Sequence, residues 1–100
     1  MNMLARQTLT ASIVQIGPLG IGAPARIHSI QFVKDSTAGE LVTVYMPFRA
    51  ESAAASNRIE SMYISRNGAT KDYAAPWDKP LDAKIMAAGS TNVTMIVWGD

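Results

Sequence analysis

The last fifth of the chain, Leu81–Trp98, constrains the fold most, because two strand-like segments follow one another there. In Leu81–Ala87 apolar residues alternate with largely polar ones, which predicts a strand with one face on a core. Asn92–Trp98 is apolar on both faces and rich in β-branched and aromatic residues, which predicts a strand inside a sheet, covered on both sides. The short polar turn 88–91 joins them, so we expect a hairpin. One cover is the protein's own core, and the other is a further sheet or another subunit.

The composition limits the class of protein. The chain has 100 residues, of which 48% are hydrophobic and only 17% charged, with a net charge of +1. A typical domain is about a quarter charged, so some apolar surface is expected to need a partner. No basic stripe marks a nucleic-acid partner. The chain has no cysteine, which excludes a disulfide framework and a thiol nucleophile.

The N-terminus lacks the charged region and long apolar run of a signal peptide, and no apolar segment approaches bilayer length. We therefore expect a protein made in a cytoplasm, with no membrane partner. Met1–Gln7 lacks the alternation of a packed strand and is expected to form an N-terminal arm.

Alternation and β-branched residues predict further strands along the chain. In one of them Ile27 and Ile30 are three residues apart, so either a bulge near His28-Ser29 returns them to one face or both faces are partly covered. The alanine-rich segment Arg49–Asn57 is too short for a stable helix and is expected to be a loop. The predicted strands are Thr8–Ile16, Ala25–Lys34, Glu40–Met46, Arg58–Ser65 and Thr70–Ala74.

Turn residues separate these strands. Gly17–Pro24 contains three glycines and two prolines and is expected to be a loop. No helix start follows these glycines, which argues against a phosphate-binding loop. Asn67-Gly68 is the strongest hairpin signal, because both central positions of a type I′ turn need positive φ. Ala75–Pro80 is expected to cross over to the final hairpin. Together the pattern predicts a single all-β domain, residues 1–100, folded as an antiparallel, jelly-roll-like β-sandwich with little or no helix.

The chain carries no recognisable catalytic set. His28 is the only histidine, and neither an orienting carboxylate nor a second metal ligand can be named for it. Asp72 and Asp78 flank Tyr73 and Trp77, an arrangement open to a sugar platform or a carboxylate pair, although such residues more often form turns and caps. We therefore expect no enzyme activity, no cofactor and no metal.

Large apolar side chains in loops and at strand ends are the candidates for contact with a partner. Trp77 lies between prolines and is the favoured anchor, because aromatic residues are enriched at interface cores. Trp98 ends a strand and is expected to belong to the core or to a contact surface. Rim charges such as Lys71 and Lys79 are expected to matter far less. The candidates are Leu4, Leu19, Ile21, Tyr45, Phe48, Trp77 and Trp98.

Three stretches, Pro24–Ile30, Asp35–Val42 and Asn92–Gly99, together resemble a group of small all-β virion proteins of tailed bacteriophages that decorate or cement the head shell. The shared features are an alanine–arginine–aliphatic entry into a strand, a small-residue turn, and an apolar terminal strand closing on glycine. The resemblance implies a virion protein, made in the host bacterial cytoplasm, that binds the outer surface of the assembled capsid and stabilises it.

The same resemblance implies two partners: the major capsid protein and further copies of the chain. A homotrimer at local three-fold positions is expected, with a dimer as the alternative. The competing class is a host-adhesion or carbohydrate-binding module that uses Tyr73, Trp77 and Asp78 as its platform.

Overall fold

The structure is a computed structural model, and it describes residues 2–17, 19, 24–34, 39–48, 51–65, 68–79 and 83–100. Nearly all of the regular structure is strand, as the alternating sequence predicted. One short 3-10 turn, η1 (Ala55–Asn57), is the only helical element among the described residues. In the described part of the chain the strands are β1 (Asn2–Thr8), β2 (Val14–Ile16), β3 (Ala25–Lys34), β4 (Glu40–Tyr45), β5 (Arg58–Ile64), β6 (Ala69–Lys79), β7 (Ile85–Ala88) and β8 (Val93–Gly99).

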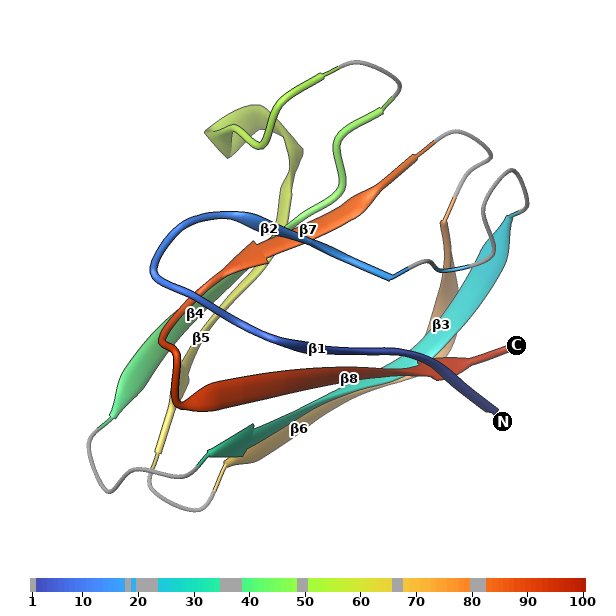
Figure 1. Ribbon diagram of the computed structural model, residues 1–100. Helices are drawn as coiled ribbons and strands as arrows, with labels where there is room; N and C mark the ends of the chain where they lie inside the picture. The colour runs from blue at the N-terminus through green and yellow to red at the C-terminus, as the bar shows by residue number, and fades with distance from the viewer. Residues whose placement is uncertain are drawn as a thin grey trace.

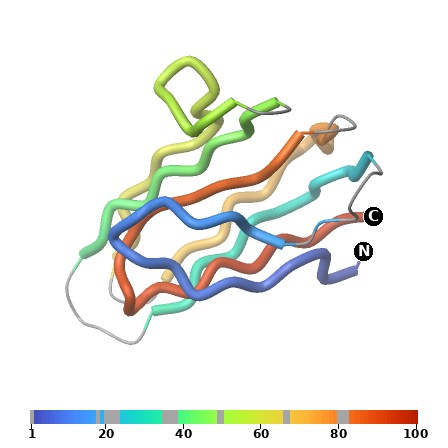
Figure 2. The backbone as a smooth tube through the Cα atoms, turned by 45° about the horizontal axis from the view of Figure 1, so that its top comes forward, coloured from blue at the N-terminus to red at the C-terminus, as the bar shows by residue number. Residues whose placement is uncertain are grey.

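The strands form two four-stranded antiparallel sheets packed face to face (Figure 1). One sheet has the order β1-β8-β3-β6 and the other β2-β7-β4-β5; we call them the β8 sheet and the β4 sheet. Most consecutive strands lie in different sheets, so the chain crosses repeatedly from one layer to the other (Figure 2). Two interlocked sheets with this order make a jelly roll, which confirms the predicted all-β sandwich.

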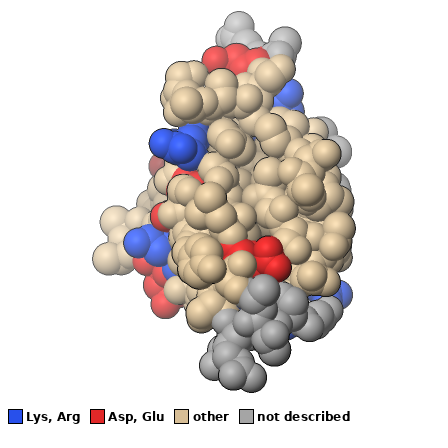
Figure 3. Space-filling model, turned by 90° about the vertical axis from the view of Figure 1, so that its left-hand side faces the viewer, with Lys and Arg blue, Asp and Glu red and all other residues tan. Residues whose placement is uncertain are grey.

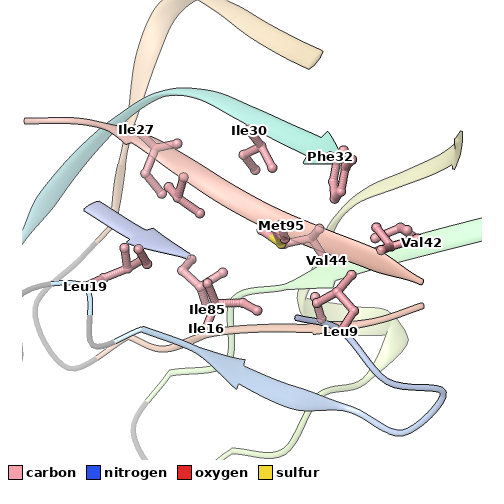
Figure 4. Close-up of a cluster of buried hydrophobic side chains, with 14 of the residues drawn as sticks. Leu9, Ile16, Leu19, Ile27, Ile30, Phe32, Val42, Val44, Ile85 and Met95 are labelled. Carbon is pink, nitrogen blue, oxygen red and sulfur yellow. The ribbon is translucent and has the colours of Figure 1, made fainter. Parts of the chain in front are cut away.

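The core lies between the two sheets and is filled by aliphatic side chains with Phe32 and Met95 (Figure 4). Each fully buried aliphatic side chain stabilises the fold by about 1.5–3 kcal/mol, which makes this cluster the main source of stability. In β8, alternate residues from Val93 to Gly99 are buried, and the residues between them are partly exposed. β8 was predicted to be covered on both faces. The core covers one face, whereas the residues of the other face are only partly buried.

Of the two alternatives for Ile27 and Ile30, the structure shows the bulge near His28-Ser29. The register of β3 shifts between Ile27 and Ser29 against both of its neighbours, β6 and β8. Ile27 and Ile30 are both fully buried. One extra residue in a strand restores a broken alternation, so the bulge allows both side chains to reach the same core.

The hairpin predicted for Leu81–Trp98 is wrong. β7 pairs with β2 and β4, whereas β8 pairs with β1 and β3 in the other sheet. The main-chain N–H of Gly89 donates to the carbonyl of Thr10, and that of Val93 to the carbonyl of Ser90, as the chain passes between the layers. Alternation identified two strands correctly but carried no information about which strand each would pair with. Residues 81 and 82 of the predicted first strand lie outside the described residues.

The Asn67-Gly68 hairpin is also wrong, although Gly68 has the positive φ that the predicted turn requires of it. Gly68 has a φ of 78° and donates to the carbonyl of Ser65 at 3.0 Å, so a turn forms there. A side chain on Gly68 would collide with the Phe32 carbonyl. The turn connects β5 with β6, which lie in different sheets. Asn67 itself lies outside the described residues.

Three further expectations need correction. Met1–Gln7 was expected to be an arm, but β1 pairs with β8 from Asn2 opposite Gly99 to Thr8 opposite Thr94. The single strand Thr8–Ile16 is divided by a bend, and its second part is β2 in the other sheet. The crossover 75–80 is largely strand, since β6 continues to Lys79 with an interruption at Tyr73–Pro76. Pro76 fits there because an interrupted edge strand does not need every N–H.

The described residues between β4 and β5 contain no α-helix, and apart from the 3-10 turn η1 they are irregular, in line with the predicted loop; residues 49 and 50 lie outside the described residues. Side-chain hydrogen bonds join parts of this segment. The carboxylate of Glu51 accepts the main-chain N–H of Phe48 at 2.8 Å, and the side-chain oxygen of Asn57 accepts that of Ala54 at 2.9 Å. The ammonium of Lys84 donates to the carbonyl of Glu51 at 3.2 Å.

Candidate interaction surfaces

The outer face of the β4 sheet carries the most exposed apolar side chains of the described strands. Register places Leu41 opposite Tyr63 on β4 and β5, and opposed residues of an antiparallel pair point to the same face. Val42 and Val44 are buried in the core, so the residues of β4 that alternate with them, Leu41 among them, point outward. Leu41 is 61% exposed and Tyr63 is 72% exposed.

The same register identifies the other residues of this outer face, since each of them lies opposite a residue that points away from the core. Arg58, which pairs with Tyr45, is the charged residue at its end. From the side on which β4 and β5 lie, charged side chains form small separate groups on a largely uncharged surface (Figure 3). We give the name uncharged face to the uncharged residues on the outer face of the β4 sheet, which are Gln15, Leu41, Thr43, Tyr45, Ser61, Tyr63, Met86 and Ala88.

On the uncharged face, the ring of Tyr63 lies close to the backbone of Gly39. A Cβ atom on Gly39 would collide with the phenol oxygen and ring carbons of Tyr63, so the ring lies directly against this backbone. Glycine at the start of β4 therefore lets an aromatic side chain lie along the sheet and remain exposed on its other side.

The outer face of the β8 sheet also carries apolar side chains, of which those on β8 are partly buried, whereas Met3 on β1 and Val33 on β3 are 55% and 42% exposed. Trp98 is partly buried and donates its indole N–H to the side-chain oxygen of Gln31 at 3.2 Å. Ile96 lies opposite Arg6 on one side and Gln31 on the other. Long polar side chains therefore flank Ile96, while Trp98 lies opposite Met3 and Ser29 and has Gln31 as its polar contact.

One corner of the β8 sheet is charged. Arg26 and Asp78 form an ion pair at 3.4 Å, with most of both side chains exposed. His28 Nε2 lies 2.9 Å from Asp100 Oδ2, so the structure supplies the carboxylate that could not be named from sequence. The hydrogen bond with His28 lowers the pKa of Asp100 below its ordinary value. Among the described residues, no three His, Cys, Asp or Glu side chains are grouped to hold a metal ion.

Tyr73 and Trp77 do not form a flat platform for a sugar. Their rings meet edge to face, with centroids 5.5 Å apart and planes at 89°. Both pack against the core, and the Tyr73 hydroxyl donates to a carboxylate oxygen of Glu60 at 3.5 Å. Burial raises the pKa of Tyr73. Asp78, the third residue of that hypothesis, is paired with Arg26.

The predicted contact residues do not come together on one surface. Leu19, only 5% exposed, belongs to the core, and Leu4 packs against it. Ile21 lies outside the described residues. Phe48 is exposed and forms an isolated bridge with Ala83 outside the named strands. Trp98, in contrast, lies on the outer face of the β8 sheet.

Of these candidates, Tyr45 belongs to the uncharged face, whereas Trp77 packs against the core from β6. Lys79 was expected at a rim, but it is only 5% exposed because β6 turns this residue inward opposite Ala25. Lys71 is exposed, as expected.

Leu41 and Tyr63 were not among the predicted contact residues. A signal for Leu41 was present, because the run Leu41–Tyr45 carries large apolar residues on both alternating faces, as the last strand does. Tyr63 had only a place in an ordinary alternation. Its exposure depends on Leu41 and Gly39, which are more than twenty residues away in the sequence.

These observations define the class as an eight-stranded jelly-roll sandwich with an exposed, uncharged outer face on one sheet. Searches of protein-family models, curated proteins and solved structures found no significant match to this chain. The fold class therefore rests on the strand order. In the part of the chain that the structure describes, no helix is long and apolar enough to cross a membrane.

Proposed function

We propose that this protein is a structural protein of a bacteriophage virion that binds the outer surface of the assembled capsid and stabilises it. The observation that carries the proposal is the uncharged face, where Leu41 and Tyr63 lie side by side and mostly exposed. Contiguous apolar surface on a soluble domain is typically covered by a partner. The resemblance of the sequence to capsid decoration proteins supplies the partner, the major capsid protein.

Stabilising the shell requires binding alone and no catalysed reaction. A protein that binds the closed shell better than its separated subunits stabilises the shell by mass action, by about 3 kcal/mol per site at a free concentration about a hundred times Kd. Many copies on one shell add these contributions. An uncharged contact surface makes binding depend on buried apolar area, so moderate salt has little effect on affinity.

The test uses capsids stripped of the protein and two matched variants. Leu41→Lys places a charge on the uncharged face, whereas Val33→Lys places the same charge on an exposed strand position of the other sheet, 42% exposed. We expect wild type and Val33→Lys to rebind and to raise the rupture temperature of the shells, and Leu41→Lys to fail in both measurements.

Two results would contradict the proposal. Decorated and bare shells that rupture at the same temperature would remove the function. Equal protection by Leu41→Lys and wild type would remove the uncharged face as the contact surface. Binding on a glycan array without binding to shells would instead favour the adhesion or carbohydrate-binding class.

A further inference from the structure

The two sheets have four edge strands, β1, β6, β2 and β5, and three of them are poor templates for another strand. β2 has only three residues. β1 loses register between Met3 and Ala5. β6 is interrupted at Tyr73–Pro76, where four residues lie opposite the bulge of β3. Short, irregular and proline-containing edges are the features by which proteins prevent strand addition.

β5 lacks these protections along most of its length. It pairs continuously with β4 from Ile64 opposite Glu40 to Glu60 opposite Val44, and its one irregularity lies beyond Glu60. The stretch Ser61–Ile64 contains no charge and no proline. None of the described strands pairs with the other side of β5, which presents the main-chain N–H and C=O groups of alternate residues, and an extended strand matches their spacing. At the end of β5 the Ile64 carbonyl already accepts a hydrogen bond from the Lys34 ammonium at 3.3 Å.

We propose that β5 pairs antiparallel with β5 of a second copy about a two-fold axis at Ser61, which joins two β4 sheets into one continuous sheet. In this full-overlap register, Ser61 meets Ser61, and Ile59 lies opposite Tyr63 of the second copy. Both Ile59 and Tyr63 are exposed in the single chain, at 37% and 72%. Aromatic–aliphatic pairs across strands stabilise a sheet, and this pair occurs twice by symmetry.

Charge is compatible with a second copy in the same register. Arg58 lies opposite Ile64, and Glu60 lies opposite Met62, so no like charges meet. A two-fold contact uses the same surface on both copies and closes at two subunits. It therefore supports the dimer and not the homotrimer expected from the resemblance.

The pairing also places two uncharged faces side by side, which would let one dimer bind a shell at two points. The dimer itself does not depend on the proposed capsid partner, and its test needs no shell.

The absence of cysteine from the sequence makes a direct test possible. Opposed residues of antiparallel strands have Cα atoms about 4.5–5.5 Å apart, within the range that a disulfide spans. Ser61→Cys is therefore expected to form a covalent dimer on mild oxidation, seen on a non-reducing gel. Thr70→Cys is the matched control, because Thr70 is an exposed residue of the other sheet's edge strand β6.

Cross-linking of Ser61→Cys alone supports the pairing. No cross-link, or equal cross-linking of both variants, overturns it. Circular dichroism with the thermal midpoint of each variant shows that both remain folded, so a negative result counts against the pairing.

Sedimentation equilibrium gives an independent test. Wild type is expected at twice the monomer mass of 10.7 kDa, and Ser61→Lys, which brings two ammonium groups together at the axis, is expected to dimerise about tenfold more weakly. A wild type that stays monomeric or forms trimers overturns the inference. If the protein dimerises but does not bind shells, the proposed function is wrong and the strand pairing stands. If a monomer binds shells, the pairing is wrong and the proposed function stands.

Discussion

The outer faces of the two sheets show how the same kind of strand can serve two purposes. β8 and β4 both carry large apolar residues on alternate faces, and each lies inside its sheet. On the β8 sheet, Trp98 is partly buried and hydrogen-bonded to Gln31, and a charged corner with the pair His28–Asp100 lies nearby. On the β4 sheet, Leu41 and Tyr63 remain mostly exposed.

The difference follows from the neighbours of each strand. Around β8, Arg6 and Gln31 flank Ile96, and Gln31 also accepts the hydrogen bond from Trp98. The outer side chains of β8 therefore contribute to the stability of the fold, although Met3 and Val33 on the neighbouring strands remain exposed. Around Leu41 and Thr43 of β4, the opposed residues are Ser61, Tyr63 and Ala88, which are small or aromatic and carry no charge. The charged Arg58 lies opposite Tyr45 at the end of the strand. We infer that the β8 face stabilises the single chain, while the uncharged face is available to a partner. Four predictions, from the largest expected effect to the smallest, test this comparison.

The largest effect is expected for Trp98→Ala. Removing a fully buried tryptophan costs about 3–5 kcal/mol, and because Trp98 is only partly buried, we expect a loss of about 2 kcal/mol in the free energy of unfolding. Urea denaturation measures it. Gln31→Ala is the control for the hydrogen bond and should cost less than Trp98→Ala. An unfolding free energy equal to that of wild type would show that the β8 face does not stabilise the fold.

Trp77→Ala tests the anchor predicted from sequence against the uncharged face. An interface anchor truncated to alanine costs about 2 kcal/mol or more of binding. Because Trp77 packs against the core and Tyr73, we expect the variant to lower the thermal midpoint of the isolated protein. Shell rupture temperature, measured below that midpoint, separates the two roles. Lys71→Ala is the exposed control on the same strand. Full protection by folded Trp77→Ala would exclude it as the anchor.

Leu41→Ala is expected to leave the free energy of unfolding within about 0.5 kcal/mol of wild type, because surface substitutions rarely do more. The same variant should weaken shell binding, since it removes apolar area from the uncharged face. Urea denaturation and rebinding to stripped capsids give the two values. A large loss of stability with unchanged binding would reverse the comparison between the two faces.

The smallest effect is expected at the charged corner. The pKa of Asp100 is lowered in the folded protein, chiefly by its hydrogen bond with His28. A carboxyl with a lowered folded pKa stabilises the fold above its ordinary pKa, and this contribution is lost as the pH falls through the folded pKa. Asp100→Asn should therefore be slightly less stable than wild type near neutral pH.

The difference between Asp100→Asn and wild type should disappear in strong acid, measured as the thermal midpoint from neutral to low pH. Asp72→Asn, at an exposed position opposite Ser29, is the control and should follow wild type throughout. A difference for Asp100→Asn that persists unchanged into strong acid would show that the carboxylate does not act through its charge.

The sequence alone determined the strands with clear alternation and some local backbone features. β3, β4, β5 and β8 lie where the pattern predicted them, Gly68 has positive φ, and the irregularity at His28-Ser29 is the bulge that was one of the two alternatives for this strand. These features depend on residues within a few positions of one another. Side-chain period, bulge and turn conformation are local properties, so a local pattern can predict them.

Only the tertiary structure decided how the strands pair and what covers their outer faces. β7 and β8 share a turn but lie in different sheets, and the segment expected to be an arm is the edge strand β1. Alternation shows which face of a strand is apolar without showing which strand lies beside it. The exposure of Leu41 depends on Tyr63 and the burial of Trp98 on Gln31. Those pairs form between distant parts of the chain, because a sheet is built from contacts that are far apart in sequence.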